Sequence, residues 1–167
     1  MTLVRIRDLD PSDSIAELTD LLHEAYLALG ELGLNYTAVD QRPDTTLRRI
    51  ERGHCLVAEQ DGRVIGTVTW YEPRTVAHCA WYRRPDVAVF GQFAVSPSCQ
   101  RRGVGSLLMA EVERRARQEG AAELALDTAQ PAKHLIDYYG SRGFRQVEVT
   151  QWKGKTYRSV IMSKTLR

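Results

Sequence analysis

The segment Gln100–Ser106 carries the residues whose types and spacing most directly suggest chemistry. It reads Gln-Arg-Arg-Gly-Val-Gly-Ser and follows a hydrophobic run that ends at Val95. If a helix begins at these glycines, its first N–H groups lack intrahelical partners and the helix dipole is positive there, which favours an anion such as a diphosphate. Arg101 and Arg102 add positive charge. A tight turn with solvated arginines is an equal alternative, because the segment matches neither the dinucleotide fingerprint nor the Walker loop.

Four aromatic residues gather at the end of an expected strand and in the connection after it: Trp70, Tyr71, Trp81 and Tyr82. Aromatic side chains at such positions can line the pocket of a small substrate, and their faces can hold a cationic amine through cation–π contacts. They can equally serve core and loop packing. We therefore treat them as candidate substrate-binding residues.

The composition is that of a soluble globular protein with a single domain over residues 1–167. Hydrophobic residues make up 43% and charged residues 26%, an ordinary balance. The net charge of +2 implies no broad attraction to nucleic acid or to an anionic membrane. No apolar run approaches the ~20 residues that cross a bilayer, and the N-terminus lacks the apolar region of a signal peptide, so we expect a cytoplasmic location.

The cysteines Cys55, Cys79 and Cys99 are odd in number and show no Cys-x-x-Cys spacing. This pattern favours reduced thiols over a disulfide framework or a zinc site, and we expect no metal. Cys99 precedes the glycine-containing loop, but no histidine is paired with it in the sequence. A cysteine nucleophile is therefore disfavoured.

Hydrophobic periodicity predicts strands and helices along the whole chain. In chain order, we expect strand Leu3–Arg7, helix 10–30, loop 31–43, helix 44–53, strands Cys55–Ala58 and Val64–Tyr71 with a turn at Asp61-Gly62, connection 72–86, strand Val87–Val95, helix Gly105–Gly120, strand Ala122–Asp127, helix Pro131–Ser141, and strands Phe144–Thr150 and Tyr157–Lys164. Asp10 and Asp44 are the expected N-caps of the first two helices. The order β-α-α-β-β-β-α-β-α-β-β predicts an α/β (α+β) fold with mixed strand directions.

The residues around the loop resemble motif A of the GNAT superfamily, the acyl-CoA-dependent N-acetyltransferases. Phe93–Gly105 contains a strand that ends in Val-x-Pro, followed by Gln-x-x-Gly-x-Gly at the helix start. Leu135–Phe144 is similar to the family's second mark, an apolar residue and a tyrosine followed by Gly-Phe, and Leu56–Val68 is similar to one of its hairpins. The match is sharpest over residues 88–145, and the element order extends it over nearly the whole chain.

This resemblance implies a sheet that splays open beside the strand Val87–Val95, with acetyl-CoA in the gap. The pantetheine arm would bond to backbone groups of that strand, and the pyrophosphate would bind the amides of the loop. A splayed strand leaves backbone donors and acceptors unpaired, and a ligand can satisfy them. The cofactor-binding residues that the resemblance implies are Phe93, Ala94, Val95, Gln100, Arg101, Arg102, Gly103, Val104, Gly105 and Ser106.

The resemblance also implies that Tyr139, four residues before the glycine of Gly-Phe, is the general acid. A phenol with a pKa near ~10 is protonated at neutral pH and can donate to the departing thiolate. The alternative role is packing of the helix on the sheet. Relatives often place a glutamate early in the cofactor strand, but this strand has no carboxylate. The general base is therefore not assigned: Glu72, His78 or Asp86 could each deprotonate the amine, directly or through water.

A second departure from the family pattern lies seven residues before Tyr139. Relatives commonly have an asparagine there that contacts the pantetheine, whereas this chain has Ala132. Thr128, Gln130 or His134 could substitute for it. The pantetheine contacts on this side are consequently not assigned by the sequence.

The sequence thus predicts an N-acetyltransferase that moves an acetyl group from acetyl-CoA directly to the primary amine of a small molecule. A protein lysine or N-terminus is one alternative acceptor, which a shallow acidic groove would favour over a closed aromatic pocket. A non-catalytic acyl-CoA sensor is another alternative, although the tyrosine argues against it. Family members often dimerise, which makes a homodimer a candidate assembly, and no nucleic-acid or membrane partner is indicated.

Overall fold

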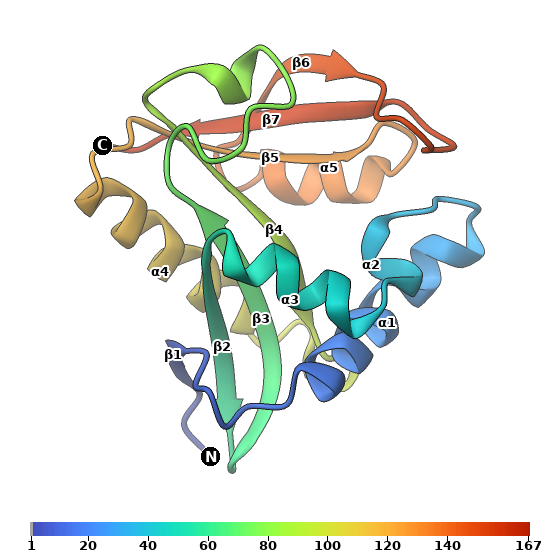
Figure 1. The fold of residues 1–167 in the computed structure, drawn as a ribbon, viewed down its shortest axis with the longest axis vertical. Helices are drawn as coiled ribbons and strands as arrows, with labels where there is room; N and C mark the ends of the chain where they lie inside the picture. The colour runs from blue at the N-terminus through green and yellow to red at the C-terminus, as the bar shows by residue number, and fades with distance from the viewer. Residues whose placement is uncertain (1) are drawn as a thin grey trace.

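The computed structural model describes residues 2–167, which form one seven-stranded sheet with helices on both faces (Figure 1). The strands follow the order β1-β2-β3-β4-β5-β7-β6, and β4 and β5 are the parallel neighbours in an otherwise antiparallel sheet. The strands are β1 (Arg5–Asp8), β2 (His54–Gln60), β3 (Arg63–Tyr71), β4 (Val87–Val95), β5 (Glu123–Ala129), β6 (Arg145–Thr150) and β7 (Ser159–Thr165). The predicted α/β fold with mixed strand directions is confirmed.

The helices connect the strands in the predicted order, with one short addition. They are α1 (Ile15–Glu31), α2 (Thr37–Asp40), α3 (Pro43–Glu51), α4 (Val104–Gln118) and α5 (Lys133–Gly140), with 3-10 turns η1 (Trp81–Arg83) and η2 (Pro97–Cys99). Apart from the start of α1, every predicted strand and helix matches the structure within two residues at each end. No helix of residues 2–167 combines the length and the apolar character that a membrane crossing requires.

Both faces of the sheet are buried, because successive side chains of a strand point to opposite faces. In β2, Leu56 and Ala58 pack in the core that includes Leu108 of α4. Their neighbour Val57 packs instead with Leu18 of α1. Helices α4 and α5 therefore cover one face, whereas α1 and α3 cover the other, and the two layers meet at the gap described below (Figure 1).

Helix α1 begins later than predicted, because its expected cap closes a separate turn. The carboxylate of Asp10 accepts hydrogen bonds from the N–H and the hydroxyl of Ser12, at 2.9 and 2.7 Å. The N–H of Asp13 bonds to the carbonyl of Asp10 at 2.9 Å. The N-cap is Ser14, whose hydroxyl accepts from the backbone N–H three residues on, at 3.1 Å. The prediction of Asp10 as N-cap is therefore wrong.

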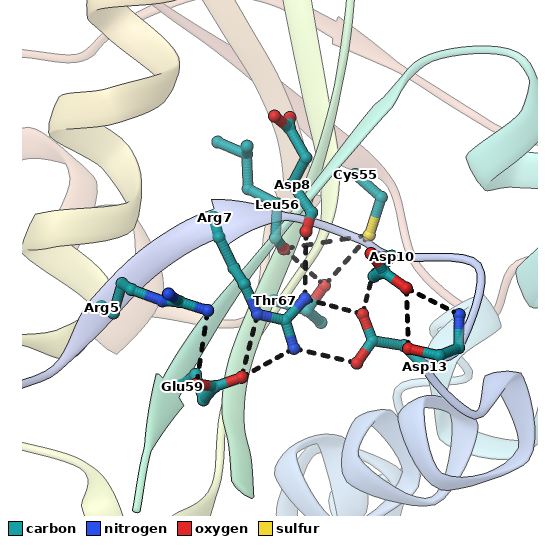
Figure 2. Close-up of polar contacts among 10 residues, drawn as sticks. Arg5, Arg7, Asp8, Asp10, Asp13, Cys55, Leu56, Glu59 and Thr67 are labelled. Carbon is teal, nitrogen blue, oxygen red and sulfur yellow. Dashed lines mark hydrogen bonds and ion pairs between the residues drawn. The ribbon is translucent and has the colours of Figure 1, made fainter. Parts of the chain in front are cut away.

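An ion-pair network holds this turn to the sheet (Figure 2). Arg7 of β1 donates to both carboxylate oxygens of Asp13, at 2.7 and 2.9 Å, and to Glu59 of β2 at 2.9 Å. Arg5 lies 3.6 Å from the other oxygen of Glu59. The hydrogen bonds from Arg7 lower the pKa of Asp13 below its usual value. The network fixes where α1 leaves the sheet, and α1 in turn reaches the gap between β4 and β5.

The predicted loop 31–43 contains the short helix α2, and α3 begins at Pro43 rather than after a cap at Asp44. Proline suits the first helical position because its missing N–H would have no partner there. Tyr36, directly before α2, explains why the segment is ordered. Its ring lies 5.2 Å from that of Tyr157, so α2 is anchored on the β7 side of the sheet.

Candidate active site

Strands β4 and β5 diverge along most of their length and open a gap in the sheet (Figure 1). Their pairing covers Val87–Val89 of β4 and Glu123–Ala125 of β5. Residues 90–95 of β4 continue without a partner on β5. The backbone groups on that edge of β4 are therefore available to side chains or to a ligand.

A β-bulge re-aims β4 at the gap. Thr67 pairs with Ala94 and Thr69 with Gly91, so one residue of β3 faces two residues of β4. The extra residue, Gln92, has a φ of 47°, which is uncommon for a side chain other than glycine. Its buried amide oxygen accepts a 2.6 Å hydrogen bond from Gln41, which holds the bulge in place. This bulge was not predicted from the sequence.

A cavity of about 450 Å³ lies on one side of the gap, and we call it the loop cavity. Its size falls within the ~300–1,000 Å³ typical of small-ligand sites. The predicted cofactor-binding residues that line it are Phe93, Ala94, Val95, Gln100, Arg101, Gly103, Val104, Gly105 and Ser106. Arg102 is exposed and does not line it. The structure thus brings nine of the ten residues together around one space.

The loop presents the start of α4 to this cavity. Gly103, the N-cap, has a φ of 81°, a left-handed conformation that glycine adopts without strain, and Arg101 has a φ of 63°. A glycine cap has no side chain to occupy the first N–H groups of the helix, and no acidic residue lies in the first turn. These amides and the positive end of the helix dipole form a binding site suited to phosphate.

Gly105 leaves the space that a ligand needs to reach those amides. A Cβ on this residue would lie 3.1 Å from the ring of Phe93 and 3.1 Å from the hydroxyl of Tyr138. Such contacts are tighter than ordinary van der Waals packing. Any larger side chain at Gly105 would therefore narrow the cavity between β4 and α5.

Arg142 supplies a further cation that sequence reasoning missed. Its guanidinium lies 3.7 Å over the ring of Tyr138 and donates to the hydroxyl of Ser106 at 3.3 Å. It lines the loop cavity, as does Tyr138. The position of Arg142, one residue before the Gly-Phe pair, was the available signal, but only the packing of α5 beside α4 shows that it reaches the start of α4.

Two carbonyls of β4 that point into the gap already have donors. The hydroxyl of Tyr26, from α1, donates to the Phe93 carbonyl at 3.0 Å. The side-chain amide of Gln100 donates to the Val95 carbonyl at 3.1 Å. Each carbonyl retains a second lone pair, so a pantetheine amide can share it or replace the present donor. Tyr26 is a second lining residue that the sequence did not indicate.

A second cavity of about 340 Å³ lies on the other side of the gap, and we call it the aromatic cavity. Of the four predicted aromatic residues, Tyr71 and Tyr82 line it. Trp70 points to the opposite face of β3, where it stacks on His54 at 4.7 Å. Trp81 packs under the guanidinium of Arg84 at 4.2 Å and does not line the cavity. The strand alternation separates Trp70 from its neighbour Tyr71, and other aromatic residues, among them Phe90 and Trp152, line the cavity as well.

All seven tyrosines of the chain line one or both cavities, and two of them line both, Tyr26 and Tyr139. The hydroxyl of Tyr26 is engaged by the Phe93 carbonyl. The hydroxyl of Tyr139 forms no hydrogen bond to another residue between 2 and 167, although its side chain is 8% exposed. Burial raises the pKa of the Tyr139 phenol well above its usual value, so it stays protonated. Tyr139 therefore has a free proton donor at the boundary between the two cavities.

The open candidates for a base are dispersed. Glu72 lies 3.5 Å from His54, and Asp86 is paired with an arginine at 2.9 Å, and neither lines a cavity. His78 does line the aromatic cavity, together with Asp127, a carboxylate that sequence reasoning did not single out. Asp127 is thus a further carboxylate that the fold brings to the site.

The position of the missing asparagine is filled by packing. Ala132 is 1% exposed and lies in a cluster with Leu29 of α1. Of its suggested substitutes, His134 lines the loop cavity, Thr128 lines the aromatic cavity and is bonded to the Tyr36 hydroxyl at 2.8 Å, and Gln130 lines neither. Within residues 2–167, no group of three or more His, Cys, Asp or Glu side chains has metal-binding geometry.

Comparison with known proteins places this architecture in a family. The sequence model of the acetyltransferase (GNAT) family matches residues 15–144, which include α1, the splayed strands, the loop and α5. The S-(2-succino)cysteine N-acetyltransferase of Bacillus subtilis (strain 168) is 31% identical over 157 residues, covering 90% of each chain.

Solved structures give the same fold. A GNAT family acetyltransferase from Elizabethkingia anophelis with acetyl-CoA bound superposes with a TM-score of 0.70 at 16% identity, covering 98% of both chains. The ribosomal-protein-S18-alanine N-acetyltransferase of Escherichia coli superposes with a TM-score of 0.73 at 18% identity, covering 98% of this chain and 94% of the other. The family match spans the loop, the gap and helix α5, which carries Tyr139. The chain therefore belongs to the GNAT family of acetyltransferases, and its activity is that of an N-acetyltransferase.

Proposed function

We propose that this enzyme transfers the acetyl group of acetyl-CoA directly to the primary amine of a small molecule. The observation that carries the proposal is that the loop cavity and the aromatic cavity share Tyr26, Leu135 and Tyr139. A thioester entering from the loop cavity and an amine entering from the aromatic cavity would meet beside Tyr139. Holding two reactants at such a junction makes the reaction effectively unimolecular.

In the proposed reaction, the neutral amine attacks the thioester carbonyl, the C–S bond breaks, and the thiolate takes the phenolic proton of Tyr139. The proton lost by the amine passes to Asp127 or His78, directly or through water. The protonated phenol suits this role because burial keeps its pKa high. The diphosphate would bind at the start of α4, where Arg101 and Arg142 add positive charge.

Two features support a small-molecule acceptor over a protein. The aromatic cavity is a walled space of about 340 Å³ beside β4, a size that suits a small ligand. The Bacillus subtilis relative is named for an acceptor that is a substituted cysteine. At 31% identity this name guides the choice of test compounds for the present chain.

The proposal is tested by a thermal shift and a thiol-release assay. Acetyl-CoA at about 100 times its Kd should raise the melting temperature by roughly 5–10 °C. Thiol release from acetyl-CoA should then depend on a small primary amine. Absence of a thermal shift at millimolar acetyl-CoA would contradict the cofactor, release with peptides alone would favour a protein acceptor, and binding without release to any amine would favour a sensor.

A further inference from the structure

The aromatic cavity carries an excess of positive charge. Three basic side chains line it: Arg49 of α3, Arg52 directly after α3, and Lys155 of the β6–β7 connection. Among the described residues that line it, the carboxylate is that of Asp127, and His78 adds a titratable imidazole. Three cations against one carboxylate leave a cavity that attracts anions rather than a bare cationic amine.

None of the three cations takes part in a salt bridge within residues 2–167. Arg49 donates to the amide oxygen of Gln41 at 2.9 Å, and Arg52 donates to the backbone carbonyl of Thr75 at 3.1 Å. Lys155 donates to a backbone carbonyl at 2.7 Å and to a threonine hydroxyl at 3.0 Å. Neutral acceptors position these side chains but do not neutralise them.

Asp127 offsets only one of the three positive charges of the cavity. Its two oxygens accept hydrogen bonds from the Tyr82 hydroxyl at 2.9 Å and from the Trp152 indole at 3.0 Å. Burial lowers the pKa of Lys155, and the positive charge of Arg49 lowers it further, whereas Asp40 and Asp127 raise it. A bound carboxylate would relieve this repulsion between Arg49 and Lys155.

Arg49 lies where it could align an amine with the cofactor strand. One of its terminal nitrogens is 3.3 Å from the position that a Cβ on Gly91 would occupy, directly before the bulge of β4. A guanidinium binds a carboxylate through two parallel hydrogen bonds, which fixes orientation as well as position. In an α-amino acid one carbon separates carboxylate and amine, so a carboxylate on Arg49 would hold the amine beside β4.

We propose that the acceptor is an amino-acid amine with several carboxylates, bound by Arg49, Arg52 and Lys155. The α-carboxylate binds Arg49, and further carboxylates bind Arg52 and Lys155 nearer the surface, where Arg52 is exposed. This inference rests on the proposed function, because it names the substrate class of the same cavity. It predicts a preference set by the number of carboxylates.

A graded series of thioether amines tests this preference. The series is 2-(ethylthio)ethylamine, S-ethyl-L-cysteine, S-carboxymethyl-L-cysteine and S-(2-succino)-L-cysteine, which carry none, one, two and three carboxylates. None contains a free thiol, so release of CoA can be followed directly. We expect kcat/KM to rise about tenfold for each added carboxylate, as one charge-assisted hydrogen bond would provide, and the rise to shrink with added salt.

Single substitutions test whether the three cations cause the preference for carboxylates. Arg49→Gln, Arg52→Gln and Lys155→Gln should each lower kcat/KM for S-(2-succino)-L-cysteine about 10- to 100-fold, as loss of a charge-assisted bond predicts, and barely affect the carboxylate-free amine. Arg48→Gln is the matched control, because Arg48 lies on the same helix and lines neither cavity. Melting temperatures of all variants show whether they remain folded.

Calorimetric titration of the same four amines into the protein saturated with CoA separates the two proposals. A flat or falling kcat/KM across the series, or an equal loss for all four amines in the variants, overturns the carboxylate preference while turnover supports an acetyltransferase of small amines. Tighter binding with each carboxylate but no thiol release from any amine supports the anionic pocket and contradicts the proposed reaction.

Discussion

Tyr26 and Tyr139 both line the boundary between the loop cavity and the aromatic cavity, yet their hydroxyl groups are placed for different tasks. Tyr26 donates to a backbone carbonyl of β4, and burial raises its pKa to about 12. Its proton is used to hold α1 against the strand. Tyr139 has no such bond within residues 2–167, so its proton is free for a leaving group.

Replacing Tyr139 with Phe should lower kcat about 100-fold or more, because the thiolate would leave without a proton donor. The KM for acetyl-CoA should change little, since the ring and its packing remain. Steady-state kinetics with the best amine of the series measure both quantities, and a melting curve confirms folding.

Tyr157→Phe is the control for that substitution. Tyr157 lines the aromatic cavity alone, and its hydroxyl also forms no hydrogen bond within residues 2–167. Its removal should leave kcat within about threefold, as expected for a hydroxyl that transfers no proton. A Tyr139→Phe enzyme with unchanged kcat would exclude Tyr139 as the acid.

Two elements provide the backbone groups of the loop cavity. The start of α4 provides free N–H groups, and β4, bent by its bulge, provides an unpaired strand edge. Gly103 leaves the first turn of α4 without a side-chain cap. Gly105 keeps the approach open between Phe93 and Tyr138. The site therefore depends on these two glycines, because any side chain at either position would cover the amides or fill the cavity.

Replacing Gly105 with Val should raise the KM for acetyl-CoA about tenfold or more. The added atoms would fall in the narrow space beside Phe93 and Tyr138, and a loss of this size corresponds to about 1.4 kcal/mol of binding. Valine has a better helix propensity than glycine, so the helix itself should not be destabilised. Initial rates at varied acetyl-CoA concentration measure the effect.

Gly140→Val is the matched control, because Gly140 also lies in a helix but a Cβ there would meet nothing within 4 Å. It should leave the KM for acetyl-CoA near that of the unmodified enzyme. Equal KM values for both variants would mean that the amides beside Gly105 do not bind the cofactor.

For the helices and strands, the sequence predicted the elements themselves well and the contacts between distant elements poorly. The loop with Gly103 was found because its chemistry lies in consecutive residues. Arg142, by contrast, contacts Ser106 across 36 positions of the sequence, and no periodicity reports such a contact. The bulge at Gln92 was missed because its cause, the buried bond to Gln41, lies in another element. Trp70 was misplaced because the face of a strand residue follows from what packs on it.

Across the whole molecule, the mixed strand directions followed from the order of strands and helices along the chain, whereas the side chains that close the site came from distant segments. Ion pairs at the surface also link segments that are distant in the sequence. Glu111 of α4 accepts from Arg114 at 2.6 Å and from Arg115 at 2.8 Å, and Arg115 also reaches Asp8 of β1. This network ties α4 to β1 at the edge of the sheet.

The network predicts a pH-dependent contribution to stability. Hydrogen bonds from Arg114, then from Arg115, lower the pKa of Glu111 to about 2. Since the folded pKa is below the unfolded value of ~4.3, the stabilisation is present above about pH 4.3 and is lost as the pH falls toward 2. Glu111→Gln should lower the free energy of unfolding by ~1 kcal/mol at pH 6, allowing for solvent screening.

Urea unfolding at pH 6 and at pH 2.5 measures this contribution, and the difference between the two proteins should shrink at the lower pH. Glu119→Gln is the control, since Glu119 ends the same helix and forms no salt bridge within residues 2–167. A pH-independent difference for Glu111→Gln would assign its effect to packing instead of charge.

The short parallel contact between β4 and β5 divides the sheet into two blocks, β1–β4 and β5–β7, whose strands pair antiparallel within each block. Regions joined by few bonds open separately, as local unfolding units do. A ligand in the gap would touch β4 in one block and Tyr139 beside the other. Occupancy would then add a second link between the two blocks, beside the hydrophobic core that they already share, and should slow local opening along the gap.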